Sequence, residues 1–293
     1  MLTLRLTQKG SKIWRGSKNT MPKPKVALAI FHSMSQPTVV SAYYPIPSKF
    51  GVEQYIKWII EFWPKTTFPL IFFTDPLIAG QFEAMFKDRK GPTRVVGIPF
   101  HMLHAFTRLS PKMWRHTHQY DPEKETHSPE LYAMWYEKKE FVLRAIQLNP
   151  FGSDSFVWCD AGICRSPEWM EHLGRFPMRE NIPAFKMLIL RIAPFEELAD
   201  KNGMFGHTKD TVTVGGGILA GSISSWVSWS KAYDAMLMKY YLSDRFIGKD
   251  QNIMASVILG NPGLIELVDP PKVMNSIQQW FYLLFYLAGV RIS

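Results

Sequence analysis

Short runs of β-branched and aromatic residues alternate with longer stretches of helical period along most of the chain. The short runs predict strands at 38–44, 69–74, 94–98, 155–159, 186–192 and 264–268. Apolar positions recur at helical spacing in 52–63, 128–148, 225–243 and 250–259, which predicts helices. This alternation is typical of an α/β fold, in which a mostly parallel sheet is flanked by helices. The sequence has no internal repeat and no break in composition, so we expect a single domain.

Composition and charge set the N-terminal arm apart from the rest of the chain. The 293 residues are 46% hydrophobic and 20% charged, a balance that excludes intrinsic disorder and is sufficient for a buried core. Seven of the 34 basic residues lie in 1–25, where no acidic residue occurs, which leaves 27 basic against 25 acidic residues in the body. We therefore expect a basic, disordered arm over 1–25 that is solvated or contacts an anionic surface, and no nucleic-acid groove in the body.

The C-terminus is apolar. The run WFYLLFYLAGV at 280–290 holds eleven uncharged residues, too few to cross a bilayer. We expect 276–293 to form an apolar C-terminal helix that packs on the domain, and peripheral membrane contact through this helix or the basic arm stays open. Cys159 and Cys164 suggest neither a disulfide framework nor a zinc site, which favours a reducing, cytoplasmic location.

Polar residues follow several of the predicted strands. Ligand sites of parallel α/β sheets lie at the carboxyl ends of the strands, so Tyr43, Tyr44 and Lys49 after the first strand are candidates for binding. Asp75 follows the second strand and could equally cap the next helix. Asp160 is the strongest candidate, because a carboxylate that leaves a fully apolar strand needs a partner or a metal.

A glycine run and an Asp-Gln pair are further candidates. Gly215, Gly216 and Gly217 lie in a hydrophobic context, where consecutive glycines indicate a strand or turn that meets a ligand closely or takes unusual dihedral angles. Neither a P-loop nor a dinucleotide fingerprint occurs. Asp250 and Gln251 open a predicted helix, where the aspartate could cap the helix or face a sugar or phosphate.

Several of these motifs together resemble the HtrL/YibB (WlaTC-like) family of glycosyltransferase-like proteins. The resemblance covers about 38–270. It rests on His127 to Tyr132, Trp135, Glu137-Lys138, Asn149 to Phe151, Phe156 to Arg165, Ser41 to Pro45 with Lys49, Phe73 to Asp75, the glycine run and Phe246 to Gln251.

The resemblance implies a GT-A-like, Rossmann-like domain over 26–275. A UDP- or GDP-sugar would be the donor and a glycan the acceptor in polysaccharide biosynthesis, with hexosyltransferase-like activity. It also implies roles for the candidate residues. Tyr43 or Tyr44 would stack on the base, with Lys49 and Asp75 near the nucleoside or diphosphate. Gly215, Gly216 and Gly217 would shape the sugar and acceptor pocket, and Asp250 with Gln251 would contact the donor sugar, Asp250 also serving as the base of an inverting transfer.

Metal dependence stays open. By the resemblance, Asp160 is the first acid of a D-x-D motif that holds Mn²⁺ or Mg²⁺ on the diphosphate, but Gly162 replaces the second acid. One carboxylate can still hold a hydrated cation through diphosphate oxygens. Alternatively, Lys138 or Arg165 offsets the diphosphate charge, as basic residues do in metal-independent members of the fold.

Two other interpretations compete with a transferase. A non-catalytic carbohydrate- or nucleotide-sugar-binding relative would account for the degenerate D-x-D motif, whereas nothing favours a glycosidase. The polar stretch 111–121 is expected to be a mobile loop over the cleft, with Trp114 as a residue that stacks on sugars. Its His116, His118 and Asp121 have a spacing that mimics a metal site.

Overall fold

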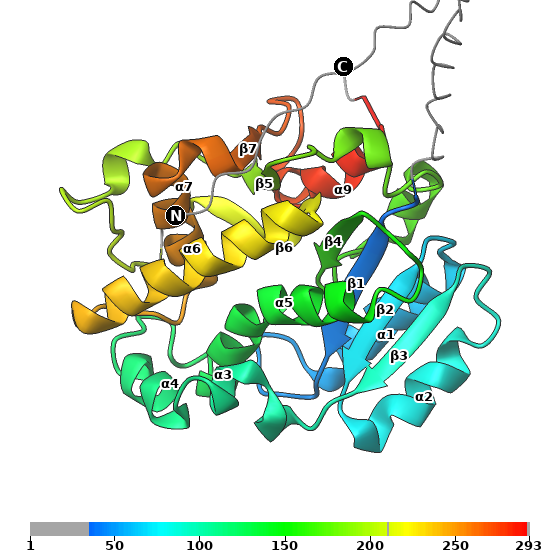
Figure 1. Cartoon of the computed structure of the whole chain (residues 1–293), viewed down its shortest axis with the longest axis horizontal. Helices are drawn as coiled ribbons and strands as arrows, with labels where there is room; N and C mark the ends of the chain where they lie inside the picture. The colour runs from blue at the N-terminus through cyan, green and yellow to red at the C-terminus, as the bar shows by residue number, and fades with distance from the viewer. Residues whose placement is uncertain (1–34, 210, 292–293) are drawn as a thin grey trace, which may run out of the picture. The chain divides into compact units, whose positions relative to one another are not determined.

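Seven strands form one sheet in the part of the chain that the computed structural model describes, residues 35–209 and 211–291 (Figure 1). Their order across the sheet is β3-β2-β1-β4-β6-β5-β7. The strands are β1 (Thr38–Tyr43), β2 (Leu70–Thr74), β3 (Thr93–Gly97), β4 (Ser155–Cys159), β5 (Met187–Arg191), β6 (Val214–Ser222) and β7 (Ile265–Val268).

The sheet is mostly parallel, which confirms the predicted α/β class. Strands β3, β2, β1 and β4 are parallel neighbours, and β5 pairs with β7 in parallel. Only β6 runs antiparallel to its two neighbours, β4 and β5. The chain builds outward from β1 to β3 and then crosses to β4 on the other side of β1. The topological switch point between β1 and β4 is where an open α/β sheet forms its ligand crevice.

Helices cover both faces of the sheet. The helices are α1 (Val52–Phe62), α2 (Pro76–Phe86), α3 (His104–Thr107), α4 (Pro111–His118), α5 (Pro129–Leu148), α6 (Ile223–Leu242), α7 (Asp250–Gly260), α8 (Ser276–Trp280) and α9 (Tyr282–Leu287). The start of α5 follows from its sequence, because Ser128 caps the backbone N–H of Leu131 and Pro129 occupies the first turn.

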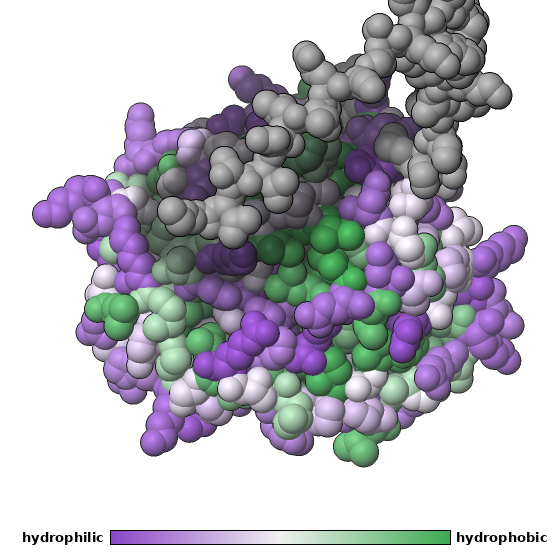
Figure 2. All heavy atoms as spheres, in the orientation of Figure 1, coloured by the Kyte–Doolittle hydropathy of each residue, from purple (hydrophilic) through white to green (hydrophobic). Residues whose placement is uncertain are grey.

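Alternate residues of the strands supply two separate cores. Val40 and Ala42 of β1 join the core under α5, α6 and α7, whereas Val39 and Tyr43 join the core under α1, α2 and α9. Helices α5 and α6 lie side by side on the first face (Figure 1). On that face Figure 2 shows hydrophilic residues along the margin and hydrophobic surface near the middle.

The structure decides between the two predictions for the glycine run and contradicts the prediction for the stretch 111–121. The glycine run is an inner strand, β6, and not a turn. The stretch 111–121 is not a loop, because 111–118 forms α4, and Trp114 is only 1% exposed with its indole N–H donating to the Ala105 carbonyl at 2.8 Å. The prediction that Trp114 stacks on sugars is therefore wrong.

The apolar C-terminus forms two short helices rather than one. The chain breaks between α8 and α9 at Phe281, and Leu283, Leu284 and Leu287 of α9 are buried. None of the helices within 35–209 and 211–291 is both long and apolar enough to cross a membrane. The basic arm predicted for 1–25 lies outside the described residues.

Candidate active site

Two adjoining cavities open at the carboxyl ends of β1 and β4, and they share Trp135, Lys138 and Asp160. The smaller, of about 100 Å³, has a mostly apolar lining that includes Ile46, Phe50, Val52, Tyr55, Leu131 and Met134. The larger, of about 470 Å³, has a lining that includes charged and polar residues and glycines, among them Lys49, Gly162, Arg165, Gly215, Gly216, Gly217, Asp250 and Gln251. The site thus joins an aromatic pocket to a charged groove.

Lys138 of α5 ties the site together. Its Nζ donates to the Gly216 carbonyl at 2.9 Å and to Asp250 Oδ2 at 3.0 Å, and lies 3.4 Å from Asp160 Oδ1. Burial lowers the pKa of the Lys138 ammonium, but the two carboxylates outweigh it and hold that pKa above its ordinary value. An ammonium has three N–H groups, so this charge is fully used within the protein.

Asp160 faces the cavities. Its side chain is 41% exposed, Oδ1 accepts the indole N–H of Trp158 at 2.7 Å, and its backbone N–H donates to the Gly217 carbonyl at 2.8 Å. Burial of its surroundings raises the pKa of Asp160, although Lys138 and Trp158 oppose this. Among the described residues Oδ2 has no hydrogen-bond partner, so it is available to a ligand.

The glycines of β6 leave space for the carboxylates of Asp250 and Asp160 beside the strand. A Cβ on Gly216 would lie 2.8 Å from Asp250 Oδ2, and a Cβ on Gly217 would lie 3.5 Å from Asp160 Oδ2. Because a side chain at Gly216 would collide with the Asp250 carboxylate, the run serves close packing within a strand. Asp250 itself is the first residue of α7 and is 6% exposed, a position where the helix dipole favours a negative charge. The neighbouring Gln251 donates from its amide to the Val214 carbonyl.

The structure brings Lys49 and Arg165 to the rim of the charged groove. Lys49 is exposed. The Arg165 guanidinium lies over the rings of Phe50, Trp58 and Phe281, with its carbon 4.9–5.1 Å from their centroids. This is cation–π geometry, which fixes the direction of the charge.

Tyr43 and Tyr44 line the aromatic pocket, but both are buried, at 5% and 4% exposure. Tyr44 donates its hydroxyl to the Ile98 carbonyl at 3.0 Å and stacks on Phe141 at 6.1 Å. Asp75 lines neither cavity. It caps α2 by accepting the backbone N–H of Leu77 at 3.0 Å, as the alternative interpretation of this residue held.

Phe50, Tyr55 and Trp135 are the aromatic residues that our sequence reasoning missed. Each is only partly buried and lines the pocket. Trp135 belongs to the family motif, which marked it as a residue of interest. The spacing of residues in α5 does not show that its side chain faces the pocket.

Gly162 stands where a D-x-D motif has its second acid, so Asp160 has no carboxylate partner two residues on. The structure also leaves no room for a side chain at Gly162. A Cβ there would lie 2.8 Å from Cε3 of Trp58 and 3.2 Å from Cε1 of Tyr55. The second nearby carboxylate is Asp250, and it is paired with Lys138. The site therefore fits a hydrated Mg²⁺ or Mn²⁺ only as a cation shared between Asp160 and substrate oxygens, since such cations keep several waters.

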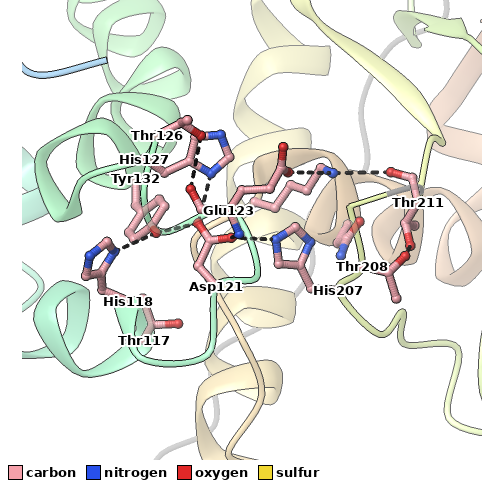
Figure 3. A network of polar contacts seen from close by, with 12 residues as sticks. Thr117, His118, Asp121, Glu123, Thr126, His127, Tyr132, His207, Thr208 and Thr211 are labelled. Atoms are coloured by element: carbon pink, nitrogen blue, oxygen red, sulfur yellow. Dashed lines mark hydrogen bonds and ion pairs between the residues drawn. The ribbon is translucent and has the colours of Figure 1, made fainter. Parts of the chain in front are cut away.

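A second polar cluster surrounds Asp121 (Figure 3). Its Oδ2 accepts from His127 at 2.8 Å and from the Tyr132 hydroxyl, and its Oδ1 accepts from His207 at 2.9 Å and from the backbone of Glu123. Burial would raise the pKa of Asp121, but these hydrogen bonds lower it to about 2.

The Asp121 cluster differs from the predicted group of His116, His118 and Asp121. His118 reaches it only through the Tyr132 hydroxyl at 2.9 Å, and His116 lies near Asp244 instead. Ligand atoms of Asp121, Glu123 and His127 lie within 4.8 Å of one another, close enough for a metal ion. Each carboxylate oxygen of Asp121 already accepts two hydrogen bonds. We therefore interpret the cluster as structural: it holds His127 against Trp135, which lines both cavities.

Sequence comparison identifies one family. A family model described as "Bacterial protein of unknown function (HtrL_YibB)" matches residues 108–287. A comparison with curated proteins finds no match.

The solved structures that resemble the chain include two glycosyltransferases. Mouse xyloside xylosyltransferase 1, in its apo form, is 11% identical over 84% of this chain and 93% of that chain, with a TM-score of 0.46. Core-mannan synthase A from Aspergillus fumigatus, in its Mn/GDP form, is 11% identical over 80% of this chain and 73% of that chain, with a TM-score of 0.44. At these scores neither structure carries an argument about function, which has to come from the site.

Proposed function

We propose that this chain, which belongs to the HtrL/YibB family because the family model matches residues 108–287, is a glycosyltransferase. It moves a sugar, in a hexosyltransferase-like reaction, from a nucleotide-diphosphate sugar to a glycan acceptor. The observation that carries this proposal is the pair of adjoining cavities of opposite character at the switch point between β1 and β4.

The aromatic pocket has the chemistry of a nucleoside site. Phe50, Tyr55 and Trp135 offer ring faces on which a base can stack, with Tyr43 and Tyr44 closing the pocket from the protein interior. A nucleobase is flat and apolar on its faces, which matches a lining of this kind. We propose that the base of UDP or GDP occupies this pocket.

The charged groove has the chemistry of a diphosphate-sugar site. We propose that Lys49 and Arg165 at its rim contact the diphosphate, while Lys138 keeps Asp160 and Asp250 in position. We propose that Asp250 and Gln251 hold the donor sugar. Oδ1 of Asp250 has no hydrogen-bond partner among the described residues, so this atom would accept the proton of the attacking acceptor hydroxyl in an inverting transfer.

A divalent cation has one place in this scheme. Asp160 would hold it together with diphosphate oxygens, and a bound Mg²⁺ or Mn²⁺ would neutralise charge on the leaving diphosphate. The other work is done by the protein's own residues. Lys49 and Arg165 bind the anion, and the glycines of β6 line the groove, where Gly216 leaves room for the Asp250 carboxylate.

The alternative is a nucleotide-sugar-binding relative without catalysis, which Gly162 favours because it removes the second acid of the D-x-D motif. Free nucleotide released from a panel of UDP- and GDP-sugars with Mn²⁺ separates the two. We expect release by the wild type and at least a hundredfold less by Asp160→Asn, with Asp88→Asn, exposed and outside both cavities, as the matched control. Binding of a donor without release would support the binding protein, and neither binding nor release would refute both.

The location follows from weaker signals. Cys159 and Cys164 are both free thiols, which agrees with a reducing compartment. We propose that the protein acts in the cytoplasm, where nucleotide sugars would be its donors, and that any peripheral membrane contact involves the basic arm or the apolar C-terminus.

A further inference from the structure

The tryptophan of α8 stands out among the aromatic residues. Trp280 is 40% exposed and lines the charged groove together with Ile277 and Phe281. Of the nine tryptophans in the described part of the chain, Trp135 is half-buried and the other seven are buried. An exposed indole at the edge of a groove offers a ligand an apolar ring face and a polar N–H, a combination that is enriched at interfaces.

Trp280 and the glycine run line a common narrow space. Gly215, Gly217, Leu190, Ile218 and Leu283 are the other residues around it, so Trp280 lies near a part of β6 that has no side chains. Of the run, Gly217 lies next to Asp160 and Gly216 lies next to Asp250. Trp280 therefore flanks the groove in which we place the donor sugar, on a different element from the aromatic pocket proposed for the base.

Resting on the proposed function, we propose that Trp280 is the stacking platform for a sugar ring of the acceptor, and hence that the acceptor is a carbohydrate at the point of transfer. A pyranose ring presents an apolar C–H face and a rim of hydroxyl groups. Trp280 covers the apolar face, while Asp160, Gln251 and Arg165 line the same groove and can bind the hydroxyl rim.

These charged neighbours favour a sugar over an acyl chain. A lipid tail would cover Asp160 Oδ2 and the Arg165 guanidinium with hydrocarbon that offers them no hydrogen bond, which is unfavourable. Val273 and Ile277, which are 71% and 63% exposed, are apolar residues of the same C-terminal segment that a membrane could otherwise use. The experiment therefore includes a membrane arm.

Binding to an array of oligosaccharides tests the proposal on the full chain. We expect the wild type to bind at least one glycan, Trp280→Ala to bind it about tenfold more weakly, and Trp280→Phe to recover most of the loss. Phe185→Ala is the matched control, because Phe185 is 83% exposed and lines neither cavity. Circular dichroism melting of each variant checks that it is folded.

Three outcomes would overturn the inference: no glycan bound by the wild type, equal binding by Trp280→Ala, or Trp280-dependent binding to phosphatidylglycerol vesicles in place of glycans. The nucleotide-release assay reports on the proposed function separately. Wild-type protein that releases nucleotide but binds no glycan leaves the transferase standing and removes the Trp280 platform. Wild-type protein that binds glycan through Trp280 but neither binds nor hydrolyses a donor leaves the Trp280 platform standing and removes the transferase.

Discussion

Replacing Lys138 by methionine removes the single cation that two carboxylates share, and this should destabilise the fold measurably. Opposite unit charges 3.0 Å apart, as Lys138 and Asp250 are, attract by about 5.5 kcal/mol at an effective dielectric constant of about 20. Asp160 adds less, because it lies 3.4 Å away and its side chain is 41% exposed, so water screens it. Breaking a buried pair on one side typically costs about 3–5 kcal/mol.

We therefore expect Lys138→Met to lower the free energy of unfolding at pH 7 by about 3–5 kcal/mol, most of it from the Asp250 carboxylate that is left buried alone. Urea denaturation followed by circular dichroism measures this. The double variant Lys138→Met/Asp250→Asn should recover at least about 1 kcal/mol of the loss, since its partner no longer carries a charge. Lys231→Met, an exposed position on α6, should stay within about 0.5 kcal/mol of the wild type.

Two results would refute this account of the site. One is a stability of Lys138→Met within about 0.5 kcal/mol of the wild type, which would mean that the ammonium is not needed. The other is strict additivity in the double variant, which would mean that Lys138 and Asp250 do not interact.

Three further outcomes test other parts of the structure. Gly216→Ala should cost about 1–3 kcal/mol in urea denaturation, because its Cβ would lie 2.8 Å from an Asp250 carboxylate that Lys138 holds in place. Gly217→Ala should cost less, since its nearest contact is the flexible end of Ile163 at 3.1 Å, and equal costs would contradict the clash. Burial raises the pKa of Glu137 from 4.5 to about 7. Its protonated form therefore favours folding below pH 4.5, and this contribution to the free energy of unfolding is lost as the pH rises through 7. Glu137→Gln should flatten the dependence of stability on pH in this range, and an unchanged slope would contradict this reasoning. Asp160-dependent Mn²⁺ binding, followed by electron paramagnetic resonance, should appear only when UDP or GDP is present, and such binding without nucleotide would contradict a cation shared with substrate.

The strands could be predicted because a parallel sheet buried on both faces leaves near-continuous apolar runs in the sequence. Residues 38–43, 70–74 and 155–159 are buried throughout and were visible as such. Helix α4 was not visible, because only Trp114 and Thr117 of its eight residues are buried and the rest is polar. The end of α8 at Phe281 was not predicted either, because apolar residues continue on both sides of it and no polar residue marks the break.

The site was predicted in its members but not in its connections. Lys138, Asp160 and Asp250 were each candidates. Asp160 was one because a carboxylate that leaves an apolar strand needs a partner, Asp250 because it opens a predicted helix, and Lys138 because of the family resemblance. That Lys138 joins the other two could not be predicted, since 112 residues separate it from Asp250 and only the packing of α5, β4, β6 and α7 brings them together. For Tyr43 and Tyr44 the strand end was right, but the register that buries both rings depends on neighbouring strands and helices.

The charges that remain after the internal pairing indicate what the groove should bind. Lys138 is used up by Asp160 and Asp250, so the groups left facing the groove are the cations of Lys49 and Arg165 and one oxygen of each carboxylate. A free sugar would satisfy the carboxylate oxygens with its hydroxyls and leave the two cations without an anion. A nucleoside diphosphate alone would satisfy the cations but would bring its own charge toward the carboxylates. A ligand that carries an anionic diphosphate at one end and a hydroxyl-rich ring at the other satisfies both sets at once, which is the composition of a nucleotide sugar.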